Sequence, residues 1–196
     1  MASRGDRFRL VETPSDGPEV DDLTCLQQIA SGDRIAFDRL YRRYYERLFR
    51  FVLRVTGRMN LVEDVINDTM IVIWRKAGEY RAAAQASTWI FGIAYRKALK
   101  ALSKESRMAD VAEQPAESGE APPPDALDRE GLHAAIRQAV MQLPPEHRAV
   151  VDLTFFFNRS YEEVAQILDC PVGTVKSRMF HARAKLRPLL NQLLGE

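Results

Sequence analysis

The stretch SYEEVAQILDCPVGTVKSRMFHARAKL, residues 160–186, predicts two helices that are joined by a tight turn. Ser160 followed three residues later by Glu163 forms a capping box, a pattern that marks the beginning of a helix. Gly173 lies in the turn after this first helix, and Thr174 is expected to cap the second helix. The apolar residues of the second helix share one face, at Val175, Met179, Ala182, Leu186 and Leu189. This arrangement is typical of a helix-turn-helix unit that reads the major groove of DNA.

The other faces of the second helix carry side chains suited to contacts with DNA. The candidates for contacts with base edges are Ser177, Phe180 and His181. The candidates for contacts with phosphates are Lys176, Arg178, Arg183 and Lys185. The alternative interpretation is an ordinary helical hairpin with a solvated basic face. The turn, the cap and the charge agree with one another, and together they favour DNA binding.

The remainder of the 196 residues predicts an all-α protein with two small four-helix domains, because apolar residues recur at spacings of three and four. Residues 108–125 hold four of the ten prolines and several acids, which predicts a flexible linker. The expected organisation is a disordered tail over 1–19, a first domain over 20–107, the acidic linker over 108–125 and a second domain over 126–196.

Charge and residue usage exclude several classes of protein. Residues 108–131 carry a net charge of −6, and because the whole chain carries +1, the remainder carries +7 and is expected to bind anions. The two cysteines and three histidines have no ligand spacing, and no glycine-rich phosphate loop is present. We therefore expect no cofactor, no metal, no small-molecule substrate and no catalysis. No apolar run is long enough to cross a membrane and no signal peptide is evident, so a cytoplasmic protein without membrane insertion is expected.

Four cations recur along one side of the helix that is expected to begin near Ser87. They are Arg96, Lys100, Lys104 and Arg107, spaced four, four and three residues apart. No acidic residue accompanies them until Glu105, so the row fits a polyanion better than a set of internal ion pairs.

Taken together, four segments resemble the extracytoplasmic-function (group IV) sigma factors of bacterial RNA polymerase, and the likeness spans residues 20–194. In chain order they are AFDRLYRRYYERLFRFVLRV (36–55), VEDVINDTMIVIWRKA (62–77), STWIFGIAYRKALKAL (87–102) and the segment that runs from LPPEHRAVV to ARAKL (143–186). The resemblance implies an alternative sigma factor whose first domain (region 2) recognises and helps to open the −10 promoter element. The second domain (region 4) would read the −35 element.

The resemblance also implies the partners and the residues that meet them. The partners would be core RNA polymerase, through its β′ clamp helices and its β flap, then promoter DNA, and an anti-sigma factor that holds the protein inactive. The candidates for contact with the β′ clamp helices are Asp64, Asn67, Asp68 and Trp74. Carboxylates on an exposed helix face pair with arginines of a partner, while apolar neighbours bury area.

The loop EYRAAAQ, residues 79–85, matches the family's −10 specificity loop, in which an aromatic residue stacks on a base flipped from the nontemplate strand. The candidates for contact with the −10 element are Tyr80, Arg81, Trp89, Arg96, Lys100 and Lys104. The triplet Ala82–Ala84 departs from the polar or glycine-containing loop of the family, and His181 stands where many relatives carry arginine. The linker acids would imitate nucleic acid on the polymerase surface, at Asp110, Glu113, Glu117 and Glu120.

Two alternatives remain open at this point. One is a helix-turn-helix regulator that does not bind core polymerase, with a first half that senses a signal or dimerises. The other is a noncatalytic protein-binding module that occupies another regulator. Binding to core RNA polymerase distinguishes the sigma factor from the first, and DNA binding by either half argues against the second.

Overall fold

The computed structural model describes residues 20–82, 84–112 and 136–194, and all regular structure in these ranges is helical. The elements are α1 (Val20–Ala30), α2 (Arg34–Thr56), α3 (Met59–Lys76), the 3₁₀ turn η1 (Ala77–Glu79), α4 (Ala86–Ala112), α6 (Pro145–Phe155), α7 (Tyr161–Leu168) and α8 (Val172–Leu194). Residues 136–141 are also helical. The prediction of an all-α chain with two helical halves is confirmed. Within the described ranges, none of the helices combines the length and the apolarity that a membrane span requires.

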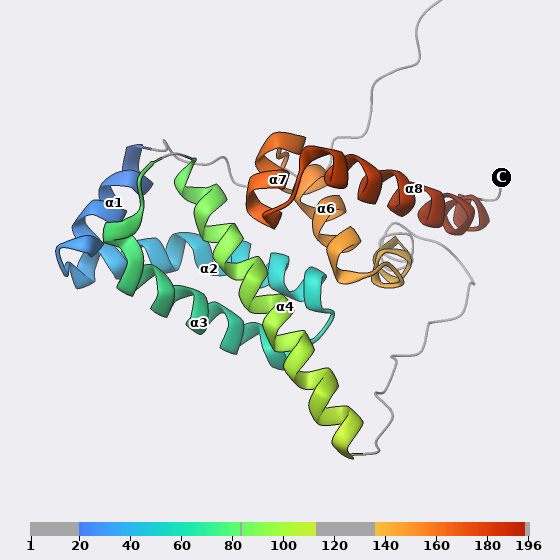
Figure 1. The fold of residues 1–196 in the computed structure, drawn as a ribbon, viewed down its shortest axis with the longest axis horizontal. Coiled ribbons are helices and arrows are strands. Elements are labelled where there is room, and N and C mark those ends of the chain that lie inside the picture. Colours follow the sequence, from blue (N-terminus) through green and yellow to red (C-terminus); the bar gives the residue numbers. More distant parts are fainter. Residues whose placement is uncertain (1–19, 83, 113–135, 195–196) are drawn as a thin grey trace, which may run out of the picture.

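Local chemistry sets the ends of the longest helix in the first half. The carboxylate of Asp33 accepts hydrogen bonds from the backbone N–H groups of Ile35 and Ala36, at 2.8 and 3.1 Å, and so begins α2. Gly57 ends the helix in the left-handed conformation, at φ 68°, and its N–H donates to the carbonyl of Leu53. Between these caps, α2 buries one stripe of residues against α1, α3 and α4 (Figure 1).

The second half contains the two helices that residues 160–186 predict. The capping box is present: the N–H of Glu163 donates to the Ser160 hydroxyl at 3.2 Å, and the N–H of Ser160 donates to the Glu163 carboxylate at 2.9 Å. The prediction that Thr174 caps α8 is wrong, because α8 begins two residues earlier, at Val172. The N–H of Thr174 bonds to the carbonyl of Pro171, so Thr174 already lies within the first turn.

The two halves pack against each other and share one hydrophobic core. Helix α7 lies against α4, and α6 lies against α2 (Figure 1). The ring of Phe157 from the second half meets the rings of Phe51 and Phe91 from the first half edge to face, with centroids 6.0 and 4.8 Å apart. A Cβ at Gly92 would lie 3.4 Å from the carbonyl oxygen of Ile167, at van der Waals contact, so the backbones of α4 and α7 approach closely at this point.

Polar groups complete the contact between the halves. Arg54 on α2 forms an ion pair of 2.5 Å with Asp152 on α6, whose side chain is 1% exposed. Arg159, in the turn before α7, donates hydrogen bonds to the side chains of Gln85 and Ser87, at 2.8 and 2.9 Å. We call this set of contacts, together with the three phenylalanines, the closure surface.

The expected flexible linker is only partly visible. Helix α4 continues to Ala112, five residues beyond the expected end of the first domain at residue 107. The rest of the linker, the tail over residues 1–19 and the first residues of the second domain lie outside the described residues. The sequence predicted two domains joined by a flexible linker. It did not predict the closure surface, because the contacts of that surface join residues that are far apart in the sequence.

Candidate nucleic-acid and polymerase interfaces

Helix α8 presents most of its predicted DNA contacts to solvent. Val175, Met179 and Ala182 are buried in the core, and this fixes which way the helix faces. Six of the seven predicted contacts are exposed as a consequence: Lys176, Ser177, Phe180, His181, Arg183 and Lys185. Phe180 is 70% exposed, the most of any large apolar residue of α8 that the structure describes. A solvent-exposed aromatic ring on a helix that enters the major groove is suited to contact with a thymine methyl group.

Arg178 is the exception among the seven. Its side chain is half-buried, and one guanidinium nitrogen lies 3.9 Å from the sulfur of Cys170. It also lies beside Tyr95 of α4, where burial raises the pKa of the Tyr95 hydroxyl to about 12 and the charge of Arg178 opposes that rise. Arg178 therefore faces the first half of the chain in this structure, and its role as a phosphate contact stays a prediction.

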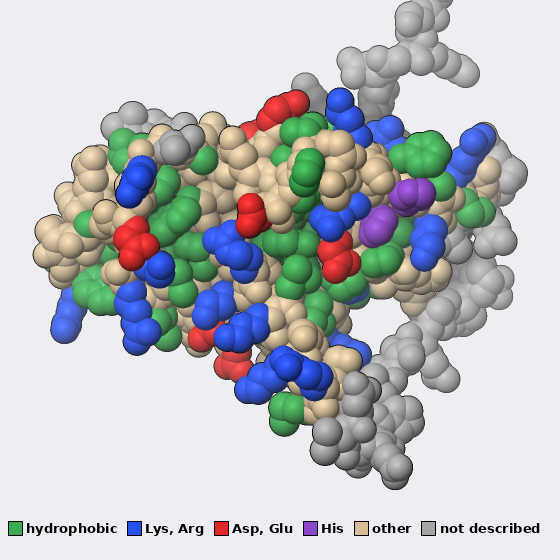
Figure 2. Space-filling model, viewed as in Figure 1, with side chains coloured by type: hydrophobic (Ala, Val, Ile, Leu, Met, Phe, Trp, Pro, Cys, Tyr) green, Lys and Arg blue, Asp and Glu red, His purple; other side chains and the backbone are tan. Residues whose placement is uncertain are grey.

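Next to α8, two histidines approach each other. His147, in the first turn of α6, lies with its ring centroid 6.4 Å from that of His181. Burial lowers the pKa of His147, and Arg178, His181 and Lys185 lower it further, while Glu146 opposes them. Figure 2 shows the two histidines side by side among basic side chains. The positive field of this face favours an anion, which agrees with the predicted phosphate contacts.

The basic row on α4 is exposed as expected. Arg96, Lys100, Lys104 and Arg107 all lie on the surface, and Figure 2 shows Lys and Arg side chains that follow the course of α4. Of these, Arg107 donates a hydrogen bond to the carbonyl of Ser103 in its own helix. The row thus remains accessible to a polyanion along its length.

The predicted −10 residues divide into a pair of aromatic residues in contact and a set of cations. Tyr80 and Trp89 are half-buried and lie with ring centroids 5.3 Å apart. The hydroxyl of Tyr80 donates to the carbonyl of Ala84 at 2.5 Å, a hydrogen bond that joins the two ends of the loop. Ala82 has a φ of 52°, a left-handed conformation that favours glycine. Arg81 is exposed beside this loop.

The predicted polymerase contacts lie on the exposed face of α3. Asp64, Asn67 and Asp68 are exposed, and Asp68 forms an ion pair of 3.0 Å with Lys97 of α4. Trp74 is 37% exposed and rests edge-on against Phe37 of α2, with ring centroids 5.3 Å apart. Because Trp74 is anchored on one side, it presents a rigid apolar surface on the other.

Sequence reasoning missed several exposed apolar residues. Ile71 is 47% exposed and lies four positions after Asn67, on the face of the predicted contacts, so helical spacing alone indicates it. Phe155 and Phe156, at the end of α6, are 45% and 38% exposed. The guanidinium of Arg54 lies 4.0 Å from the ring centre of Phe156.

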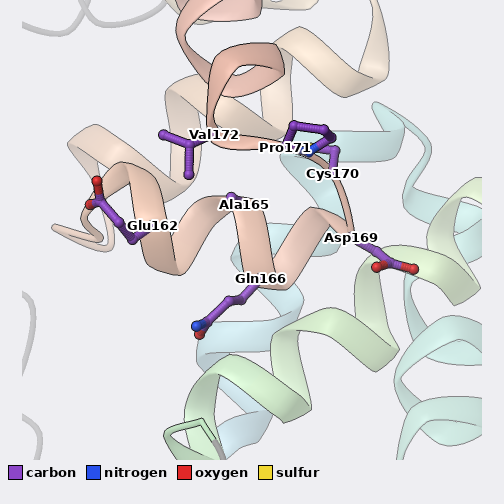
Figure 3. A pocket seen from close by; sticks show the side chains of 7 residues that line it. All are labelled: Glu162, Ala165, Gln166, Asp169, Cys170, Pro171 and Val172. Atoms are coloured by element: carbon purple, nitrogen blue, oxygen red, sulfur yellow. The ribbon is translucent and has the colours of Figure 1, made fainter.

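A shallow open hollow of about 440 Å³ lies at the turn between α7 and α8. Its lining residues are Glu162, Ala165, Gln166, Asp169, Cys170, Pro171 and Val172. Figure 3 shows Glu162 and Asp169 pointing away from each other, so their carboxylates do not converge on a ligand. Among the described residues, no group of His, Cys, Asp and Glu side chains has the arrangement of a metal site. The hollow is part of the turn and shows none of the convergent polar groups of a substrate site.

Comparisons with known proteins agree with this geometry. Residues 40–108 match the family description "Sigma-70 region 2", and residues 133–186 match "Sigma-70, region 4". The chain is 31% identical over 186 residues to the RNA polymerase sigma-H factor of Pseudomonas aeruginosa, which covers 89% of this chain and 96% of the relative. It is 30% identical over 189 residues to the ECF RNA polymerase sigma-E factor of Escherichia coli K12, covering 89% and 98%.

Solved structures show the same fold. One is the sigma factor RpoE in complex with the anti-sigma factor NepR from Bartonella quintana, with a TM-score of 0.65 and 25% identity, covering 79% of this chain and 96% of that chain. Another is CnrH in complex with the cytosolic domain of CnrY, with a TM-score of 0.64 and 24% identity, covering 88% and 98%. The two matched regions, in the family's order, and the full-length relatives together show that this chain belongs to the sigma-70 family, as an RNA polymerase sigma factor of the extracytoplasmic-function group.

Proposed function

We propose that this sigma factor directs core RNA polymerase to promoters by reading a −35 element with α8 and a −10 element with α4 and the loop before it. The observation that carries the proposal is the exposure of six of the seven predicted DNA contacts on α8. RNA synthesis belongs to the polymerase, and this chain contributes binding without catalysis of its own. Its place of action is the cytoplasm, where core polymerase and promoters meet.

At the −35 element, α8 enters the major groove with its first turns. Ser177, Phe180 and His181 face the base edges, and Phe180 supplies an apolar contact for a thymine methyl. Lys176, Arg183 and Lys185 meet the phosphates on either side, and Arg178 joins them when it leaves Tyr95. If about five phosphates are neutralised, log affinity falls with log salt at a slope of roughly −4 to −5.

At the −10 element, the pair of Tyr80 and Trp89 forms an aromatic platform at the start of α4. A base that leaves the duplex stack gains about 1 to 3 kcal/mol by stacking on such a ring. Arg81, Arg96, Lys100 and Lys104 track the backbone of the single strand, in the order in which they follow the platform.

The proposed polymerase contacts use two other surfaces. The exposed face of α3 with Asp64, Asn67, Asp68 and Trp74 meets the β′ clamp helices, and Ile71 adds apolar area at the centre of that face. On the second half, the exposed rings of Phe155 and Phe156 are suited to an apolar contact with the β flap.

The solved relatives RpoE and CnrH are each bound to a second protein, the anti-sigma factor NepR and the cytosolic domain of CnrY. We propose that an anti-sigma factor also controls this chain, by covering its polymerase-binding surfaces. The nucleic-acid-like role of the linker acids Asp110, Glu113, Glu117 and Glu120 remains a proposal. Removing their charge without any change in promoter escape or nonspecific DNA binding would count against it.

Run-off transcription with purified core RNA polymerase on a library of promoters tests the function and its sequence preference together. The wild-type chain is expected to start transcripts at promoters that share a −35 and a −10 sequence.

A DNA-binding assay tests the proposed phosphate contacts. Lys176→Gln is expected to lower the salt slope of DNA binding by about 1 and to weaken binding by a similar factor on every sequence. The matched control is Arg50→Gln, an exposed arginine of α2 outside both DNA surfaces. A chain that starts no transcript with core enzyme on any template contradicts the proposal.

A further inference from the structure

His147 lies beside the proposed −35 reader but belongs to a different helix. Pro144 and Pro145 begin α6, and the N–H of His147 donates to the carbonyl of Pro144 at 2.9 Å, which places His147 in the first turn. Its ring centroid lies 6.4 Å from that of His181, one of the residues of α8 proposed to face base edges. This short separation brings the beginning of α6 to the edge of the surface that is proposed to meet DNA.

Helical spacing divides the basic side chains of α8 between two flanks. At about 100° per residue, Lys185 lies on one side of the buried stripe, and Lys176 and Arg183 lie on the other. The structure places a residue of α6 beside each flank. The guanidinium of Arg183 lies 6.0 Å from the ring centre of Phe155, whereas His147 lies in the field of Lys185. Because the two DNA strands border the major groove on opposite sides, each flank meets the phosphates of one strand.

The ring of His147 offers a hydrogen-bond donor on the Lys185 flank. Figure 2 shows the two histidines of the described ranges at the surface of the molecule. Nδ1 of His147 is buried and has no hydrogen-bond partner among the described residues, so Nε2 is the ring nitrogen that a group from solvent reaches. An N–H group at Nε2 donates to a phosphate oxygen, and the bond is stronger when the ring is charged.

The surroundings of His147 keep its ring neutral in the free chain near pH 7. Burial lowers the pKa of His147, and the charges of Arg178, His181 and Lys185 lower it further, while Glu146 opposes them. A phosphate close to the ring acts in the opposite sense, because a negative charge favours the protonated imidazole. A phosphate contact at His147 is therefore coupled to the uptake of a proton.

Other helices that pack against α6 bring charged groups that pair elsewhere. Arg54 of α2 pairs with Asp152, and Glu163 of α7 pairs with Arg159. The field at His147 therefore comes from its own helix and from α8, the helix that is proposed to enter the groove.

We propose that His147 is a further DNA contact of this sigma factor: from α6 it binds a backbone phosphate on the Lys185 flank of α8, beside the bases that His181 faces. This inference rests on the proposed function, because it uses α8 as the −35 reader. It deepens that function by adding a contact from outside the helix-turn-helix unit. Since the histidines gain positive charge on binding, DNA affinity rises as the pH falls toward 6.

The test measures the affinity of the full chain for a labelled 30-base-pair duplex of mixed sequence at pH 7.5 and pH 6.0, at one low ionic strength. Each proton taken up on binding changes the affinity by at most about tenfold per pH unit. The wild type is expected to bind about tenfold more tightly at pH 6.0, with His147 and His181 both contributing. His147→Gln, which lacks the titrating ring, is expected to gain only about threefold.

A gain-of-affinity variant separates a DNA contact from a merely structural role. His147→Lys carries its charge at both pH values, so it is expected to bind at least about threefold more tightly than the wild type at pH 7.5. Its remaining pH dependence should match that of His147→Gln. Loss of folding does not raise affinity, so this variant decides the question even if His147→Gln is less stable.

The salt dependence of binding provides a second measurement. A charged histidine on a phosphate releases about one further counterion, so the slope of log affinity against log salt should be steeper at pH 6.0 than at pH 7.5, by about 1 in the wild type. In His147→Gln the two slopes should differ by about half as much.

Asp152 is another group of α6 that titrates in this range, because burial raises the pKa of its carboxyl to about 7. It is 1% exposed and pairs with Arg54, so it makes no contact with DNA. Asp152→Asn is therefore the matched control and should keep the tenfold gain at pH 6.0. Loss of the gain in this variant would assign the pH dependence to Asp152 and overturn the proposal.

Two further results would also overturn the proposal: equal pH dependence in the wild type and His147→Gln, or no gain of affinity in His147→Lys. If Lys176→Gln still weakens duplex binding in either case, the proposed DNA face of α8 stands and only the inference about His147 fails. If Lys176→Gln has no effect either, the proposed function of that face fails as well.

Discussion

Arg54 and Asp152 lie 98 positions apart in the chain and form an ion pair of 2.5 Å between α2 and α6. Asp152 is 1% exposed, and burial raises the pKa of its carboxyl from 3.8 to about 7, although Arg54 opposes the rise. Burial outweighs the pairing because Oδ2 has no partner among the described residues. The contact therefore joins the halves at a cost that depends on pH.

The first prediction concerns that pH dependence. Between the unfolded pKa of Asp152 near 4 and its folded pKa near 7, the folded chain binds more protons than the unfolded chain. The contribution of Asp152 to the free energy of unfolding is therefore largest below pH 4 and falls as the pH rises to 7, by on the order of 2 to 4 kcal/mol. Urea unfolding of wild type and Asp152→Asn at pH 5 and pH 8 measures this. The difference between the two pH values should be smaller in the variant, and equal differences would contradict the prediction.

The second prediction concerns the aromatic centre of the closure surface. Phe157→Ala removes the ring that meets Phe51 and Phe91, and it should lower the free energy of unfolding by about 2 to 4 kcal/mol. The matched control is Phe155→Ala in the same run, because Phe155 is 45% exposed. Its loss should cost less than about 1 kcal/mol. Comparable losses in the two variants would show that Phe157 is not a packing centre.

The third prediction concerns the loop before α4. Ala82 adopts a φ of 52°, so Ala82→Gly relieves backbone strain and should stabilise the chain by about 0.5 to 1 kcal/mol. Ala84→Gly is the control. Residue 84 does not share the positive φ, so glycine there only adds freedom to the unfolded chain and should destabilise it slightly. Thermal unfolding checks both, and a loss of stability in Ala82→Gly would refute the strain argument.

The fourth prediction concerns the α3 face. Trp74→Ala should weaken binding to core RNA polymerase by at least about thirtyfold, because a rigid, partly exposed tryptophan is the residue type that dominates interface energies. Lys76→Ala, at the exposed end of the same helix, should bind within about threefold of the wild type. Fluorescence titration with core enzyme measures both affinities. Because Trp74 contacts Phe37, circular dichroism should confirm that the variant remains folded.

Local rules predicted much of the fold. The capping box of Ser160 and Glu163 depends on residues three apart, and the faces of α8 depend on helical spacing, so both are readable from the sequence. The cap of α8 was misplaced because the turn at Pro171 closes earlier than the side chain of Thr174 suggests. Exposure of the predicted contacts on α8 followed from the same helical spacing.

The contacts between the halves were not predictable in this way. Nothing near Arg54 or Asp152 in the sequence indicates their pairing, and the acidic, proline-rich segment between the halves favoured separate modules. Phe157 reads as one more residue of an apolar run, and only the arrangement of α2, α4 and α6 makes it central. Arg178 was expected among the exposed cations for the same reason, since Tyr95 reaches it only through the tertiary fold.

The length of α4 determines where the chain leaves the first half and so how the two halves are connected. This helix of 27 residues carries the chain about 40 Å away from the loop over residues 79–85 before it ends at Ala112. Residues 113–135 then provide 23 residues, a tether whose greatest possible length is about 75 to 80 Å. Because residues 113–135 join the two halves covalently, the contact between the halves is intramolecular and corresponds to a raised effective concentration of each half near the other. A separate molecule that competes for the contact surface of either half must overcome this effective concentration. A longer connection between the halves would lower the effective concentration without changing any contact.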